Sequence, residues 1–294
     1  MAVDENRSVP VRERDVLCMG PHGLHRIAYR EWGNPEHRKV LMCVHALTRN
    51  SHDFDFLARA LADHYRVICP DVAGRGHSDR LRVADDYVLP TYANDMITLI
   101  ARLDVEQVDW VGTSMGGLIG MVIASQPGSP IRRMALSDVG PLITAEAIQR
   151  IGDYVGMAPK FASVEEVEQY IRVVAAPFGR LPDAHWRHLA EHAVRPAAGG
   201  GFEMNYDAAI AEPFRKLFVE IGKDVDLWPV YDAVSCPTLL LRGAESDLLT
   251  HATAVEMTRR GPKARLVEIQ GVGHAPMMLD DYQIEVVRNF LLEQ

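Results

Sequence analysis

The sequence predicts an α/β fold with a mostly parallel eight-stranded sheet, helices on both faces and a helical insertion. Three observations support this prediction. Short apolar, β-branched runs alternate with helical patterns through most of the 294 residues. These runs are continuously apolar, as expected for parallel strands that are covered on both faces. The alternation stops near Pro141 and resumes after Tyr231, which indicates that a separate element interrupts the sheet.

The first element is expected to be an antiparallel hairpin, which pairs Asp15–Cys18 with Arg26–Tyr29 around Gly20–Gly23. The parallel strands are expected, in order, at Lys39–His45, Tyr65–Cys69, Val108–Val111, Arg133–Leu136, Pro237–Arg242 and Ala264–Ile269. The helices that connect or follow them are expected at Phe54–His64, Thr91–Leu103, Leu118–Ser125, Ala252–Arg260 and Tyr282–Leu292.

The segment 141–231 differs from the rest because it contains mostly helical patterns and loops, such as Ser163–Val174 and Asp183–Ala193. We interpret it as a helical cap domain over the carboxyl edge of the sheet, where ligands bind in open α/β folds. Residues 1–140 and 232–294 would form the core domain.

Composition limits the possible partners. The formal net charge of −9 argues against nucleic acid and anionic membranes as partners, and no apolar run approaches membrane-spanning length. The polar segment Met1–Arg14 does not resemble a signal peptide, so a soluble, cytoplasmic protein is expected. The cysteines fit no metal motif, and a disulfide framework is not expected: Cys18, Cys43, Cys69 and Cys236.

The stretch Gly112-Thr113-Ser114-Met115-Gly116 has the pattern G-x-S-x-G between a strand-like run and a helix-like run. A chain that passes from strand to helix within about three residues turns so sharply that only small residues fit around the serine. Ser114 is therefore expected at the tip of a nucleophile elbow, with its hydroxyl exposed.

A serine hydroxyl is a weak nucleophile and needs a neighbouring base that takes its proton. His274 is the candidate base. Gly271 and Gly273 precede it and Pro276 follows it, which indicates a loop just beyond the last apolar strand.

The base needs an acid that holds its tautomer and stabilises the imidazolium. Asp247 is the candidate, because it follows the strand Pro237–Arg242 and gives the chain order serine, acid, histidine. Two alternatives stay open. Glu245 lies in the same loop, and Asp138 follows the strand Arg133–Leu136.

The oxyanion of a tetrahedral intermediate needs preorganised amide donors. The amide of Met115, directly after the nucleophile, is one candidate. The amide of Leu47, in the loop His45–Arg49 after the third strand, is the other. We expect His45 itself to be structural.

These motifs together resemble the α/β-hydrolase superfamily, and its single-cap branch of esterases and carbon–carbon hydrolases most of all. The resemblance runs from about Leu24 to the end of the chain and is carried by Val44–Leu47, Asp71 with Gly74–Asp79, Gly112–Gly116, Gly243–Asp247 and Gly273–His274. It implies the α/β-hydrolase fold, a triad of Ser114, Asp247 and His274, and oxyanion donors at Leu47 and Met115.

The chain departs from this family pattern at two places. Ala46 stands where the family usually has glycine, and Asp247 follows Gly243 by four residues where three is common. The second departure is a further reason to keep Glu245 and Asp138 as alternatives.

The favoured function is that of a carboxylesterase, which cleaves esters of small to medium apolar groups through an acyl-enzyme. The alternative is a carbon–carbon bond hydrolase or lactonase with the same triad, followed by a non-catalytic ligand receptor on the same fold. A small-molecule ester is the expected partner, and no cofactor or metal is expected. His185, His188 and His192 have a spacing that can seat a metal, but we interpret them as a solvated helix face.

Overall fold

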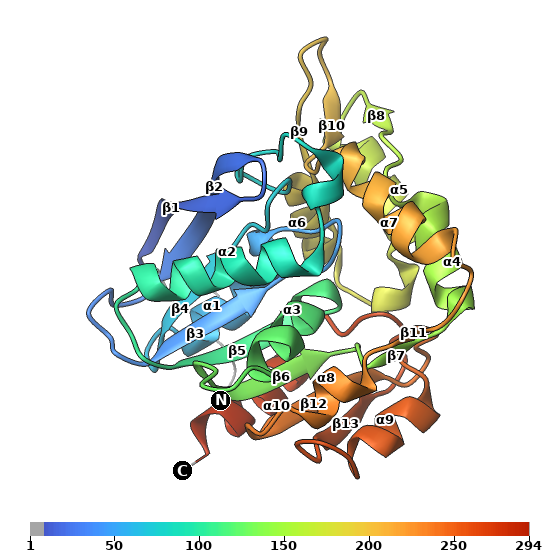
Figure 1. Cartoon of the computed structure of the whole chain (residues 1–294). Coiled ribbons are helices and arrows are strands. Elements are labelled where there is room, and N and C mark those ends of the chain that lie inside the picture. Colours follow the sequence, from blue (N-terminus) through green and yellow to red (C-terminus); the bar gives the residue numbers. More distant parts are fainter. Residues whose placement is uncertain (1–8, 294) are drawn as a thin grey trace.

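The computed structural model describes residues 9–293, apart from the side chains of residues 217 and 218. Residues 1–8 of the polar N-terminal segment therefore lie outside the described residues. An eight-stranded sheet forms the centre, in the order β1-β2-β4-β3-β5-β6-β12-β13 (Figure 1). Its strands are β1 (Val11–Gly20), β2 (Gly23–Trp32), β3 (Val40–Val44), β4 (Arg66–Pro70), β5 (Val108–Thr113), β6 (Ile131–Ser137), β12 (Thr238–Gly243) and β13 (Arg265–Ile269).

The sheet is mostly parallel, as the sequence predicted. From β4 through β13 in this order, every neighbouring pair is parallel. Strand β2 runs antiparallel to both β1 and β4. The β1–β2 hairpin is longer than expected, because its pairing continues from Gly20 opposite Gly23 out to Val11 opposite Trp32.

Helices cover both faces of the sheet. Alternate residues of β3 enter opposite clusters, since Leu41 and Cys43 pack on one face and Met42 and Val44 on the other. The first face carries α1 (Asp55–Leu61) and α10 (Asp281–Leu292). The second face carries α2 (Leu89–Arg102), α3 (Met115–Ala124), α8 (Trp228–Asp232) and α9 (His251–Met257).

Segment 141–231 leaves the sheet after β6 and returns before β12. Its first strand, β7 (Leu142–Ile143), pairs with its last strand, β11 (Val225–Asp226), so the two ends of the segment lie side by side. Apart from α8, its helices lie beyond the arrowheads of β3 and β6 in Figure 1. Between these ends come α4 (Ala145–Tyr154), β8 (Lys160–Phe161), α5 (Val164–Val174), α6 (Asp183–Ala193), β9 (Val194–Pro196), β10 (Phe202–Met204) and α7 (Ala211–Phe214).

Local sequence explains where these helices begin. Thr144 accepts a hydrogen bond from the amide of Ala147 and begins α4, and Ser163 caps α5 through the amide of Glu166. The segment also has its own apolar cluster, which includes Val167, Ile171 and Leu189, among others. In the part of the chain that the structure describes, no helix has the length and apolar character needed to cross a membrane.

Candidate active site

Ser114 lies at the turn from β5 into α3. Its backbone has φ 51° and ψ −116°, a strained conformation for a residue with a side chain, and its amide donates to the carbonyl of Ser137. A Cβ on Gly116 would come 1.9 Å from the carbonyl oxygen of Val44. A Cβ on Gly112 would come 2.4 Å from the carbonyl carbon of Gly116. Only glycine fits at both positions, so the packing of strand against helix fixes the serine at the tip.

His274 reaches Ser114 from the loop that follows β13. Its Nε2 lies 3.1 Å from Oγ of Ser114. Neighbouring residues hold this loop from two sides. Oγ of Ser137 donates to the carbonyl of Pro276, and the amide of Gly273 donates to the carbonyl of Pro177 in the inserted segment. The serine and histidine of the sequence prediction are therefore brought together.

Asp138 occupies the position beside the other ring nitrogen. Its Oδ2 lies 2.8 Å from Nδ1 of His274, and its side chain is fully buried. Two further donors hold the carboxylate. The amide of Gly243 donates to Oδ1 at 2.8 Å, and the hydroxyl of Ser246 donates to Oδ2 at 2.5 Å. Hydrogen bonds to both carboxylate oxygens satisfy the buried Asp138 and hold it in place beside His274.

Asp247 does not lie beside His274, so this part of the sequence prediction is wrong. Its side chain is 56% exposed and pairs with Arg150, whose Nη2 donates to Oδ1 at 2.9 Å. Glu245 is exposed as well. The last residue of β12 contributes the Gly243 amide and the loop after it contributes the Ser246 hydroxyl. Both groups hold Asp138, and neither Glu245 nor Asp247 of that loop lies beside His274.

Asp138 was one of the two alternatives that the sequence left for the acid. The order of strands in the sheet explains why it lies beside His274. Strands β5, β6, β12 and β13 are consecutive in the sheet, and their carboxyl ends carry Ser114, Asp138, the Gly243 loop and His274 respectively. The end of β6 therefore lies between the serine and the histidine loop. Chain order alone does not give this adjacency.

The two predicted oxyanion donors, Leu47 and Met115, both line the cavity at Ser114. Met115 is the first residue of α3, where backbone amides have no partner within the helix. The carbonyl of Leu47 accepts a hydrogen bond from Nε of Arg75 at 2.8 Å. Arg75 is almost completely buried and also donates to the hydroxyl of Tyr92. From the sequence we named this arginine only within the motif Gly74–Asp79 and gave it no role of its own, whereas in the structure it holds the Leu47 loop in place.

His45 lies at the start of the same loop, completely buried. Burial lowers its pKa to about 3, because a charged imidazole would lose its hydration there. The neutral ring is satisfied on both sides. Its Nδ1 donates to the carbonyl of Ala46 and its Nε2 accepts from the amide of Val72. It therefore packs the loop, in agreement with the structural role expected for it.

Ser114 and His274 open into a cavity of about 730 Å³ between the sheet edge and the inserted segment. The lining is mainly apolar and includes Leu118, Val139, Ile148, Ile151, Phe178 and Phe214. Two arginines also line it. Arg49 is paired with Asp53, and Arg150 is paired with the exposed Asp247. The site can therefore hold an extended apolar molecule, and two arginines that are paired with carboxylates form part of its lining.

Comparison with known proteins agrees with this arrangement. A family model described as the alpha/beta hydrolase fold matches residues 39–281. The chain is 48% identical over 280 residues to the 3-hydroxybutyrate-oligomer hydrolase of Cupriavidus necator, covering 94% of this chain and 96% of that protein. It is 27% identical over 254 residues to the 2-(acetamidomethylene)succinate hydrolase of Mesorhizobium japonicum, covering 86% and 87%.

Solved structures show the same relationship. An alpha/beta hydrolase from Novosphingobium aromaticivorans has a TM-score of 0.86 with 31% identity, and 97% of this chain and 99% of that chain are covered. The chain therefore belongs to the α/β-hydrolase family, and the resemblance noted in the sequence is confirmed. It is an enzyme of the hydrolase class.

Proposed function

We propose that this protein is a serine carboxylesterase that hydrolyses short ester oligomers of 3-hydroxy acids through an acyl-enzyme. The observation that carries the proposal is the hydrogen-bonded series Ser114, His274 and Asp138 at the wall of an apolar cavity. Nucleophile, base and orienting carboxylate have the geometry that acyl transfer to a serine requires.

In the proposed mechanism, Oγ of Ser114 attacks the ester carbonyl while its proton passes to Nε2 of His274. The amides of Met115 and Leu47 stabilise the oxyanion. As the intermediate collapses, His274 gives the proton to the leaving alkoxide, and the acyl group stays on Ser114. Water, deprotonated by His274, then releases the acid and restores the serine. Asp138 holds the imidazole in the tautomer that these steps need and stabilises its charged form.

The substrate class follows from the cavity and from the 48%-identical relative, whose name specifies 3-hydroxybutyrate oligomers. Such oligomers have a methyl-bearing ester chain and, at one end, a free carboxylate. The apolar lining suits the chain, and about 730 Å³ is within the usual range of roughly 300–1,000 Å³ for small-molecule sites. Arg150 can bind the carboxylate by exchanging its partner Asp247 for the substrate.

We also propose that residues 141–231 act as a cap domain on a core formed by 1–140 and 232–294. The pairing of β7 with β11 and the separate apolar cluster of the segment support this division. A cap of this kind would exclude water from the acyl pocket.

A cytoplasmic location remains part of the proposal. Its support is that all four cysteines are free thiols, which is usual in a reducing compartment. Cell fractionation with an antibody against the protein would test it, and recovery outside the cytoplasm would contradict it.

The direct test of the proposed function is hydrolysis of a 3-hydroxybutyrate trimer by the wild type, Ser114→Ala and Ser125→Ala. Ser125 lies at the end of α3, away from the cavity lining, and serves as the matched control. We expect Ser114→Ala to lose turnover by on the order of 10⁶-fold, and Ser125→Ala to keep it. Unchanged turnover in Ser114→Ala would refute the proposal.

The second candidate function is cleavage of a carbon–carbon bond or lactone by the same residues. Its support is the similarity to the Mesorhizobium hydrolase, whose named substrate is an unsaturated diacid. Parallel assays on the trimer, a simple lactone and a ring-fission diketone would separate the two candidates, since only one class should show a kcat/KM in the ordinary enzymatic range of about 10⁴ M⁻¹s⁻¹ or more.

A further inference from the structure

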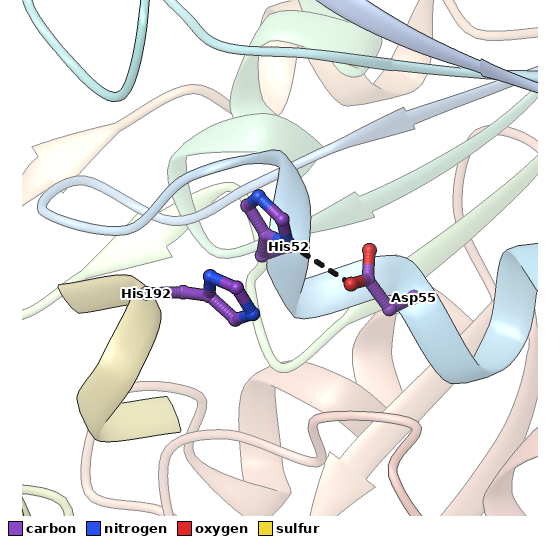
Figure 2. Close-up of side chains that lie close together, drawn as sticks. All are labelled: His52, Asp55 and His192. Carbon is purple, nitrogen blue, oxygen red and sulfur yellow. Dashed lines mark hydrogen bonds and ion pairs between the residues drawn. The ribbon is translucent and has the colours of Figure 1, made fainter. Parts of the chain in front are cut away.

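Three imidazoles and a carboxylate gather where α6 of the inserted segment meets the core. His52 and Asp55 belong to the short helical stretch that leads from Ser51–Phe54 into α1. His188 and His192 lie one turn apart in α6. Figure 2 shows His192 approaching from its own helix and facing His52 and Asp55, which share the other ribbon. None of the four residues lines the catalytic cavity.

From the sequence we interpreted the α6 histidines as a solvated helix face, and the structure corrects this for His188 and His192. The rings of His192 and His52 stack with centroids 3.6 Å apart, and the ring of His188 lies edge-on to His192 at 4.6 Å. Both α6 histidines are partly buried against the core. The carboxylate needed to complete a ligand set comes from α1, far away in sequence.

The donor atoms are close enough to share one ion. His52, Asp55 and His192 each offer one ligand atom, and these atoms all lie within 4.8 Å of one another. In tetrahedral zinc sites, ligand atoms about 2.0–2.1 Å from the metal lie roughly 3.4 Å apart. Side-chain rotations that move the ligand atoms by about 1 Å would therefore close the site around an ion.

Hydrogen bonds and ion pairs hold His52, Asp55 and His188 in their orientations around the place where an ion would bind. Oδ2 of Asp55 lies 3.0 Å from Nδ1 of His52 and 4.0 Å from Nε2 of His188. Oδ1 of the same carboxylate pairs with Nη1 of Arg30. This pair fixes the carboxylate, so that Oδ2 faces the histidines. Nε2 of His188 donates to the carbonyl of His52. Imidazole and carboxylate groups are ligands that suit Zn²⁺, and contacts of this kind orient such ligands.

We propose that His52, Asp55 and His192 form a Zn²⁺ site, with His188 beside it, that fastens the inserted segment to the core. His52 follows Leu47 by only five residues, so a bound ion would fix the Leu47 loop and α6 relative to each other. The site is structural and is separate from the chemistry at Ser114.

The test measures Zn²⁺ binding to the full chain by calorimetry, after treatment with a chelator, in the wild type and in matched His→Gln variants. We expect one ion per chain in the wild type. His52→Gln and His192→Gln should each weaken binding at least tenfold, because each removes one ligand. The matched control His251→Gln, at an exposed histidine paired with Glu268, should leave it unchanged.

Three further measurements keep the test independent of folding defects. Circular dichroism in the absence of metal should be the same for all variants, and saturating Zn²⁺ should raise Tm by a few degrees in the wild type and His251→Gln only. Substitution by Co²⁺ should give the visible absorption of a tetrahedral ion in the wild type. The proposal is overturned if the wild type binds no Zn²⁺, or if all variants bind it equally. Neither result would affect the proposed esterase function.

Discussion

Oδ2 of Asp138 lies 2.8 Å from Nδ1 of His274, although 136 residues separate the two in the chain. This contact supports the proposal that Asp138, directly after β6, is the carboxylate that orients His274. Asp247, the acid expected from chain order, is the natural control residue when the role of Asp138 is tested by substitution.

Asp138→Asn should lower kcat on ester substrates by roughly 10³–10⁴-fold, since an amide can leave the imidazole in the wrong tautomer and cannot stabilise its charged form. Asp247→Asn should change kcat by less than about threefold, because its side chain is mostly exposed and does not contact His274. Steady-state kinetics of both variants on a p-nitrophenyl ester would decide. Equal loss in both variants would contradict the assignment.

Arg150→Gln should weaken recognition of substrates that carry a free carboxylate. We expect KM for the 3-hydroxybutyrate trimer to rise by about 10–100-fold, the loss of one charge-assisted pair, with kcat little changed. The methyl ester of the same trimer serves as the control substrate, and its KM should be similar in the wild type and the variant. A parallel rise for both substrates would assign Arg150 a structural role instead.

Gly116→Ala should destabilise the fold by about 3 kcal/mol or more, because its new methyl group would lie 1.9 Å from a backbone oxygen that cannot move away. Gly199→Ala is the control, since a Cβ there meets nothing within 4 Å. Urea unfolding gives both free energies of unfolding. A stable, active Gly116→Ala protein would show that the elbow is packed less tightly than the structure indicates.

The buried His45 should make the protein sensitive to acid. Its folded-state pKa of about 3 lies below the ordinary value of 6.5, so below pH 6.5 the unfolded chain binds more protons than the folded one. The stabilisation by neutral His45 is complete above pH 6.5. It is lost as pH falls toward 3, by at most about 1.4 kcal/mol per pH unit.

Replacement of His45 by Gln tests this, because an amide can still accept from the Val72 amide but does not titrate. We expect His45→Gln to lose less stability than the wild type between pH 7.5 and pH 5. Urea unfolding at the two pH values measures the difference. The same loss in both proteins would show that other groups control the acid limit.

Much of the fold could be predicted because its signals are local. Continuous apolar runs such as Lys39–His45 indicated buried parallel strands, and the observed β3 lies within that run. The elbow at Ser114 was equally local, because the two glycines and the strand-to-helix passage lie within five residues. Local patterns missed the short strands of the inserted segment, since two-residue pairings such as β7 with β11 have no periodicity that can be read.

The sequence by itself determined the alternation of strands and helices and singled out Ser114 and His274 as candidates, because backbone sterics and apolar periodicity act over a few residues. Tertiary structure alone decided which carboxylate lies beside His274, since only the order of strands in the sheet brings the end of β6 between Ser114 and His274. It also decided the surroundings of His192, whose partners His52 and Asp55 come from a helix more than 130 residues earlier in the chain.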